Sequence, residues 1–371
     1  MRHLTLYSMP LIWCSISGHG FGHAAQMLPV LNELGRKVSG IRAILRTTVP
    51  PWFFDGRLTM AWEVSPAEQD IGCIQRGPLT IDVDATWAAH QAFHAEWEKR
   101  VVQEIYAIRS TAPDLVVSNI SHLAVEAAAR AGVPAVGLCS LSWDEVLEPL
   151  LDLEGPARGA QAEVVRRIRQ SYGFADLMIR ATPGIPLSAF TKVVDIGPIA
   201  QPLAPDPARV RRAISAGARE QLVLVSFGGI ALDALPYDRL ERLTSYQFIV
   251  SGPVPAGSRR VRSAASIPVS FGTLLASADI LVTKPGYSTV VEAVAQSKPV
   301  VYVRRYNFVD EDCLVGYLHR YGRAAELSAA DFASGRWEAA LNGVSRTSQP
   351  SETAPPATGA AEAAAILAGY V

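Results

Sequence analysis

An apolar strand, a glycine turn and a following helix occur near the start of this chain, and a second strand and glycine turn occur past its middle. The first copy has an apolar run at 10–17, a turn at 18–23 and an amphipathic helix at 24–37. The second starts with the apolar run 221–226 and the turn Phe227-Gly228-Gly229. Further apolar runs alternate with helical patterns along the chain, which is typical of parallel sheets covered by helices. The sequence therefore predicts an α/β protein with two such domains.

A proline-rich stretch divides the two halves. At 371 residues the chain exceeds one usual domain. We expect an N-terminal domain over 1–197, a linker over 198–207 and a C-terminal domain over 208–345. The remainder, 346–371, begins with a segment rich in Ser, Thr and Pro that is expected to be mobile, and it ends in an alanine-rich helix.

Composition excludes several classes of function. The net charge is −1 and no long basic run is present, so nucleic acid is not expected as a partner. The four cysteines are widely spaced and show no metal-binding pattern, which predicts a reduced, cytoplasmic protein. Residues 1–17 have the look of a signal peptide, but its removal would delete the first strand. No apolar run reaches the roughly 18 residues of a membrane helix.

The stretch 283–293 has the pattern of a nucleotide site. A buried strand is predicted at 278–282, and Gly286 then turns into a helix that starts with Ser288 and Thr289. Free amides and the dipole at a helix start bind anions such as phosphate. Glu292 lies about one helical turn further on, where its carboxylate could accept hydrogen bonds from ribose hydroxyls. The alternative is an ordinary strand–turn–helix with a surface glutamate.

This stretch resembles the donor site of GT-B glycosyltransferases, above all the group of the bacterial lipid-linked N-acetylglucosaminyltransferase and the plant galactolipid synthases. The chain is also similar to the glycosyltransferase-like N-terminal part of plant arabinose kinases. The resemblance implies a GT-B fold, in which two Rossmann-like domains with parallel sheets face a cleft. It implies that Gly286, Ser288 and Thr289 bind the pyrophosphate of a nucleotide sugar, with UDP as the nucleotide, and that Glu292 binds the ribose.

The resemblance implies further donor contacts in the second domain. Gly229 would bind phosphate through its amide, and Phe271 would pack on the nucleotide base. Asp310 and Glu311 would bind hydroxyls of the donor sugar. The alternatives are a core phenylalanine and a solvated acidic turn.

In the first domain the resemblance implies a general base. His23 follows the glycine turn, and an imidazole can take a proton from an attacking hydroxyl. His19 is a second candidate, and the alternative for His23 is packing at the helix start. Many relatives orient the histidine with an Asp where this chain has Asn119, so either His23 acts alone, another carboxylate serves, or catalysis is lost. Asn119, Trp143 and Asp144 are assigned to the acceptor side.

These patterns predict an inverting glycosyltransferase that needs no metal and no cofactor other than its nucleotide-sugar co-substrate. The acceptor would be a small molecule or lipid-linked, which leaves room for peripheral membrane contact. One alternative is a catalytically silent accessory protein that binds nucleotide sugars. Another is a nucleotide-sugar hydrolase or epimerase on the same fold, which would need a carboxylate near the anomeric carbon. A dehydrogenase is disfavoured, because the first loop lacks a clean dinucleotide fingerprint.

Overall fold

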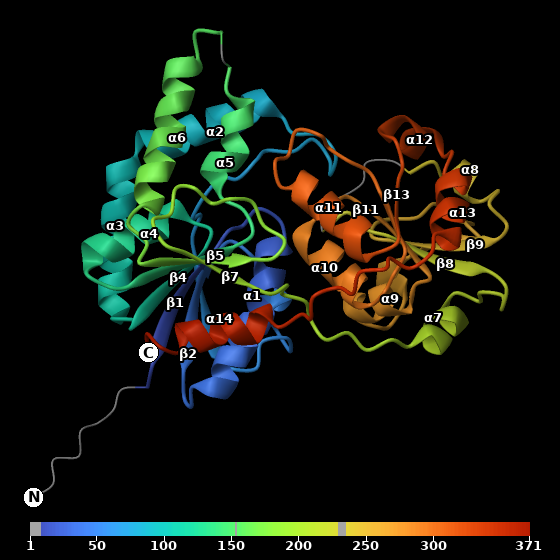
Figure 1. Cartoon of the computed structure of the whole chain (residues 1–371), viewed down its shortest axis with the longest axis horizontal. Coiled ribbons are helices and arrows are strands. Elements are labelled where there is room, and N and C mark those ends of the chain that lie inside the picture. Colours follow the sequence, from blue (N-terminus) through green and yellow to red (C-terminus); the bar gives the residue numbers. More distant parts are fainter. Residues whose placement is uncertain (1–8, 153, 229–234) are drawn as a thin grey trace, which may run out of the picture. The chain divides into compact units, whose positions relative to one another are not determined.

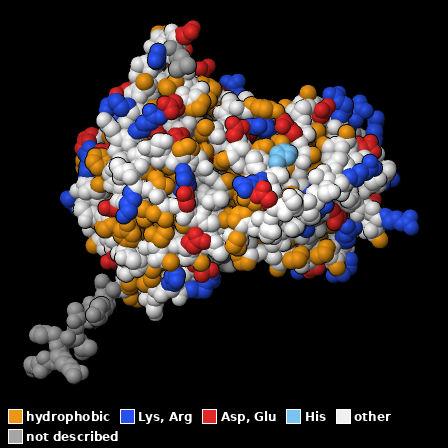
Figure 2. Space-filling model, viewed as in Figure 1, with side chains coloured by type: hydrophobic (Ala, Val, Ile, Leu, Met, Phe, Trp, Pro, Cys, Tyr) orange, Lys and Arg blue, Asp and Glu red, His pale blue; other side chains and the backbone are white. Residues whose placement is uncertain are grey.

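The computed structural model describes residues 9–152, 154–228 and 235–371, and these form two compact units. Unit 1 contains the described residues up to Ile74 together with Val83–Ile199 and Thr358–Val371. Unit 2 contains Gln75–Asp82 and Ala200–Ala357. Over unit 1, basic and acidic side chains are interspersed on the face drawn in Figure 2, which fits the near-zero net charge.

Unit 1 is built on a seven-stranded, wholly parallel sheet with the strand order β3-β2-β1-β4-β5-β6-β7. The strands are β1 Leu11–Ile16, β2 Arg42–Thr47, β3 Ala61–Pro66, β4 Leu115–Asn119, β5 Ala135–Cys139, β6 Leu177–Ala181 and β7 Val193–Ile196. The central strands β1, β4 and β5 are buried along their whole length, as expected for a parallel sheet covered on both faces.

Helices cover both faces of this sheet (Figure 1). They are α1 Gly22–Lys37, α2 Val83–Ala95, α3 Trp97–Thr111, α4 His122–Ala131, α5 Trp143–Leu147, α6 Arg158–Tyr172 and the C-terminal α14 Gly359–Leu367, with short 3₁₀ turns at Pro51–Phe53 and Glu148–Leu150. Helix α14, drawn in red, packs beside α1 and so belongs to unit 1. No helix among the described residues is long and apolar enough to cross a membrane.

Unit 2 repeats the architecture with a six-stranded parallel sheet in the order β10-β9-β8-β11-β12-β13. Its strands are β8 Gln221–Val225, β9 Tyr246–Val250, β10 Val261–Ser263, β11 Ile280–Thr283, β12 Val300–Tyr302 and β13 Ala324–Glu326. Its helices are α7 Pro207–Ala213, α8 Tyr237–Leu240, α9 Phe271–Ser277, α10 Tyr287–Ala295, α11 Glu311–Tyr321, α12 Ala329–Ser334 and α13 Glu338–Arg346, with a 3₁₀ turn at Ala264–Ser266. The prediction of two parallel-sheet α/β domains is confirmed.

Two local features differ from the sequence analysis. Apolar residues at helical spacing over 86–110 predict a single long helix. In the structure this helix is broken at Glu96, which leaves helical geometry, and the Trp97 indole donates a hydrogen bond to Glu126. The segment Gln75–Asp82, assigned by sequence to the first domain, belongs to unit 2 because Leu79 packs against the core of that unit.

Candidate functional site

Each sheet has one position where the strand order reverses direction, and the candidate residues gather there. In unit 1 this position lies between β1 and β4, and in unit 2 between β8 and β11. Ligands of open parallel sheets bind beyond the carboxyl ends of the strands at such switch points. The glycine turns 18–22 and 226–228 follow β1 and β8, and the turn 284–286 follows β11. The fold therefore provides one candidate half-site in each unit.

His23 is held in one tautomer at the switch point of unit 1. Its Nδ1 lies 2.7 Å from Asn119 Oδ1, and Asn119 Nδ2 donates to Gln26 Oε1 at 2.8 Å. Because an amide oxygen only accepts, Nδ1 carries the hydrogen and Nε2 keeps its lone pair. Nε2 has no hydrogen-bond partner among the described residues. Burial lowers the pKa of His23 to about 4, so the ring is neutral at pH 7 and able to accept a proton.

Three residues assigned by sequence to the acceptor are fully buried. Asn119 uses its amide on His23 and Gln26, and Asp144 accepts a hydrogen bond from Arg169 at 3.1 Å. Trp143 also has no exposed surface, and its ring lies 5.7 Å from the His23 ring. In this structure none of the three side chains is exposed, and their assignment to the acceptor side stays a prediction.

Sequence analysis missed a buried carboxylate beside these rings. Asp70 accepts hydrogen bonds from Ser17 Oγ at 2.8 Å and from Trp143 Nε1 at 2.9 Å. Burial raises the pKa of Asp70 to about 6, against the opposing effect of these two hydrogen bonds. The segment that carries Asp70 follows the edge strand β3. Because the residues of β3 alternate in exposure, the sequence has no apolar run there that would predict the strand or the segment after it.

His19, the second candidate base, is tied to that same segment. Its Nε2 donates to the carbonyl oxygen of Cys73 at 2.8 Å, and Gly72 packs so closely that an added Cβ would lie 2.7 Å from the His19 ring. The His19 ring lies 5.3 Å from Trp143. His19 therefore fixes the position of the 70–73 segment on the half-site of unit 1.

The turn at Gly286 opens onto space at the start of α10. The first hydrogen bond of the helix runs from Val290 N to Gly286 O at 2.9 Å, so Ser288 and Thr289 lie in the first turn. Among the described residues, no heavy atom lies within 4 Å of a Cβ placed on Gly286. The helix start and the open turn have the form of an anion site.

Lys284, to which sequence analysis gave no role, lies beside both glycine turns of unit 2. Its Cε would be 3.9 Å from a Cβ on Gly228, and Gly286 follows it by two residues. Burial and the neighbouring Arg305 guanidinium lower the pKa of Lys284 to about 7. A half-buried lysine beside a turn that has the form of an anion site is suited to a phosphate group.

The other predicted donor residues fall into distinct environments. Glu292 is buried in α10, and Phe271, which starts α9, leaves 43% of its surface exposed and thus has a face for a planar ligand. Gly229 lies outside the described residues.

Asp310 and Glu311, at the start of α11, have different surroundings. Glu311 is fully buried and accepts hydrogen bonds from Arg305 N at 2.9 Å and Arg305 Nε at 2.5 Å. Both oxygens of Glu311 thus bind Arg305, and the expected contact of Glu311 with a donor sugar stays a prediction. Asp310 is also buried, yet its Oδ1 has no hydrogen-bond partner among the described residues. Burial raises the pKa of Asp310 to about 7.

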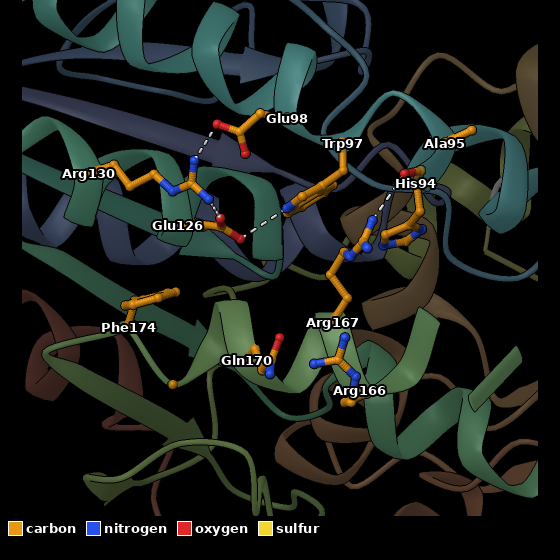
Figure 3. A pocket seen from close by; sticks show the side chains of 11 residues that line it. His94, Ala95, Trp97, Glu98, Glu126, Arg130, Arg166, Arg167, Gln170 and Phe174 are labelled. Atoms are coloured by element: carbon orange, nitrogen blue, oxygen red, sulfur yellow. Dashed lines mark hydrogen bonds and ion pairs between the residues drawn. The ribbon is translucent and has the colours of Figure 1, made fainter. Parts of the chain in front are cut away.

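A cavity of about 770 Å³ lies elsewhere in unit 1, among α2, α3, α4 and α6 (Figure 3). The predicted site residues do not line its described wall, and its charged side chains are already paired. Arg130 contacts Glu98 at 2.7 Å and Glu126 at 2.5 Å, and Arg167 donates to the His94 carbonyl oxygen at 3.2 Å. The chemistry therefore points to the switch points and not to this cavity. Among the described residues, no group of three or more His, Cys, Asp or Glu could hold a metal ion.

The two sheets and their switch points can be compared with known proteins. The chain aligns with the calicheamicin glycosyltransferase CalG4 at 18% identity and a TM-score of 0.59, over 98% of this chain and 94% of that one. It aligns with Medicago truncatula UGT71G1, solved with UDP-glucose, at 10% identity and a TM-score of 0.60, over 97% and 94%. Phytolacca americana UGT2, solved with UDP-2-fluoro-glucose and pterostilbene, aligns at 16% identity and a TM-score of 0.57, over 91% and 89%.

The chain has the GT-B fold. By sequence it is 25% identical over 335 residues to the L-arabinokinase of Arabidopsis thaliana, a match that covers 87% of this chain. It spans 31% of the length of that relative. No family model matches the chain. The expected relation to GT-B proteins and to plant arabinose kinases is confirmed.

Proposed function

We propose that the protein transfers a sugar from a UDP-linked donor to a hydroxyl or amine of a small-molecule or lipid-linked acceptor, with inversion at the anomeric carbon. The reaction would use no metal and no further cofactor. Unit 2 would bind the nucleotide sugar, and unit 1 would supply the general base.

The state of His23 is the observation that carries this proposal. Asn119 fixes the hydrogen on Nδ1 and leaves the Nε2 lone pair available. In the proposed step, Nε2 takes the acceptor proton while the acceptor oxygen or nitrogen attacks the anomeric carbon. The bond from that carbon to the diphosphate breaks, and its electron pair leaves with the nucleoside diphosphate. At pH 7 the imidazole is neutral and has a lone pair for the proton, but its low pKa makes it a weak base, so the imidazolium that forms needs stabilisation.

The donor half-site suits the leaving group. The first turn of α10 and the Lys284 ammonium would offset the negative charge that grows on the diphosphate. Glu292 would bind ribose hydroxyls and Phe271 the base. The partnerless Oδ1 of Asp310 would accept a hydrogen bond from a donor-sugar hydroxyl, because a buried carboxylate oxygen without a partner is costly.

The test joins donor binding to turnover. Thermal shift with a panel of UDP-, GDP-, ADP- and dTDP-sugars should reveal a rise in melting temperature with UDP-sugars, since a ligand of the folded state stabilises it. Addition of a small-molecule extract should then release UDP. The variant His23→Gln should keep donor stabilisation but lose UDP release. If no nucleotide sugar stabilises the protein, the proposal is wrong.

A silent nucleotide-sugar-binding protein is the second candidate, and Asn119 favours it, because a neutral amide cannot offset an imidazolium charge. It predicts donor stabilisation without UDP release from any extract. A hydrolase would instead release UDP at the same rate with and without the extract, and an epimerase would convert the sugar without releasing UDP.

A further inference from the structure

One buried carboxylate of unit 1 stands apart from the others. Among the described residues of that unit, three buried carboxylates pair with arginines: Glu104 with Arg46 at 2.9 Å, Glu126 with Arg130 at 2.5 Å, and Asp144 with Arg169 at 3.1 Å. Asp70 is the fourth, and it has no basic partner there. A buried charge without an opposite charge is costly, and such groups mark functional sites.

Asp70 is nevertheless held in a fixed orientation. One oxygen accepts from the Ser17 hydroxyl, and the other accepts from the Trp143 indole. Ser17 follows β1 and Trp143 begins α5, so two rigid elements position the carboxylate. This arrangement keeps an anion in place without neutralising it.

The positive charge that would complete the site has one source in the proposed reaction. His23 becomes an imidazolium when it takes the acceptor proton, and Asn119 offers that ring a hydrogen bond but no charge. The Trp143 indole, whose N–H binds Asp70, lies 5.7 Å from the His23 ring. Asp70 and His23 thus both neighbour the Trp143 indole, and charges in a buried site interact over such a range.

We propose that Asp70 is a positioning residue that offsets the positive charge on His23 during transfer, in the role that Asn119 cannot fill. This inference rests on the proposed function, and it assigns the carboxylate that would stabilise the protonated His23. This carboxylate lies in the segment after β3. The resemblance to GT-B enzymes led us to expect it at the end of β4.

The other ionisable groups around Asp70 supply no competing fixed cation. Glu68, on the same segment, contacts Arg100 at 3.6 Å, and Tyr172 reaches the site from α6. Asp144 of α5 is paired with Arg169, and Cys139 at the end of β5 lies 3.9 Å from His23 Nδ1. His19 contacts Trp143 and is the remaining group that could carry a positive charge.

The pH dependence of turnover gives a sharp test. Activity needs Asp70 ionised and His23 neutral, so the wild type should lose activity as the pH falls through about 6, the pKa of Asp70. In Asp70→Asn the plateau should fall roughly tenfold. The acid limb should also move down to about 4, which is the pKa of His23. Asp70→Glu keeps the charge and should restore most of the plateau. Glu68→Gln is the matched control: it should keep the plateau and lower the acid limb only slightly, because the Glu68 charge makes a small contribution to the raised pKa of Asp70.

A double-mutant cycle separates this role from acceptor binding. In a His23→Gln background, Asp70→Asn should change the small residual rate of UDP release less than about twofold, because the charge to be offset is gone. An undiminished loss in that background, or a loss confined to the acceptor KM, would overturn the proposal. His19→Gln should leave the Asp70→Asn effect intact.

An independent readout needs no turnover. In ¹⁵N NMR the Trp143 indole signal should titrate near pH 6 in the wild type and stay constant in Asp70→Asn. A flat wild-type signal would overturn the role of Asp70 even if the protein transfers sugar. Conversely, a Trp143 indole signal that titrates in a protein that never releases UDP would count against the proposed function. It would also count against this role of Asp70, because no positive charge would then form on His23.

Discussion

At the scale of single residues, Gly286 offers the clearest test of the donor half-site. Its φ of −134° is open to any residue, and an added Cβ meets no heavy atom of the described part of the chain within 4 Å. Gly286→Val should therefore fold with a melting temperature close to that of the wild type. The side chain would fill the space in front of α10, so stabilisation by UDP should disappear. Thermal shift with and without UDP measures both effects.

The control for this substitution is Gly316→Ala in α11, where an added Cβ also meets nothing within 4 Å. It should retain the full UDP shift. A Gly286→Val protein that still responds to UDP would place the nucleotide elsewhere.

Lys284 should make nucleotide affinity depend on pH. Its pKa of about 7 means that the ammonium forms as the pH falls from 8 to 6, so UDP should bind more tightly at pH 6. Lys284→Met should weaken binding about tenfold at pH 6 and flatten the dependence. Calorimetric titration at both pH values checks this. Asp310 gains its proton over the same range, so Asp310→Asn is needed as a control, and it should leave the Lys284 effect in place.

Some residue roles could be predicted because sequence fixes strand ends. His23 and Asn119 are 96 positions apart, yet each follows or ends an apolar strand, and the pairing of β1 with β4 brings them together. Asp70 could not be found in this way, because no apolar run precedes it. Full burial of Trp143 and Asp144 also depends on packing that a single sequence does not reveal.

At the scale of elements, three histidines link α2 and α4 to the segment that carries Asp70. His122 Nε2 lies 3.1 Å from His94 Nε2, His94 Nδ1 donates to the His90 carbonyl oxygen at 2.8 Å, and His90 Nε2 donates to Gly72 O at 2.8 Å. The contact between His94 and His122 requires that at least one of the two rings be neutral, because one nitrogen must accept the hydrogen. Burial lowers the pKa of His90 and of His94 to about 4, and that of His122 well below its usual value.

This chain of rings predicts acid sensitivity. Between pH 6.5 and 4 these histidines bind protons in the unfolded state but stay neutral in the folded state. The free energy of unfolding therefore falls as the pH drops through this window. His94 alone should account for about 2 kcal/mol at pH 5. Asp70 and Asp310 act in the opposite direction, because their raised pKa values favour the folded state as the pH falls. Urea unfolding of wild type and His94→Gln should give a shallower pH dependence in the variant; equal slopes would refute the assignment.

The predictability of elements follows the same physics. Buried central strands have continuous apolar runs and could be read from sequence, whereas the outer strands β3, β10 and β13 are short or partly exposed and could not. The break at Glu96 was also beyond sequence, because the helical pattern runs through it and tertiary contacts of Trp97 decide it.

At the scale of the whole molecule, the chain returns to unit 1 at its C-terminus. Gly359 N donates to Pro198 O at 3.1 Å, and Glu362 accepts from Gly197 N at 3.0 Å, which anchors the start of α14. An added Cβ on Gly359 would lie only 2.0 Å from the Gly197 carbonyl oxygen, a backbone atom that cannot turn aside. The glycine is therefore required by the approach of two backbones.

Gly359→Ala should destabilise unit 1 by about 2 kcal/mol, because α14 must shift and lose part of its packing against α1. Six of the seven tryptophans lie in unit 1, so the fluorescence change in urea chiefly reports that unit. Gly343→Ala in α13 is the matched control: the same methyl group meets nothing within 4 Å and should stabilise unit 2 slightly. The UDP-induced stabilisation of unit 2 should survive in both variants. Equal unfolding curves for Gly359→Ala and the wild type would mean that α14 does not contribute to the stability of unit 1.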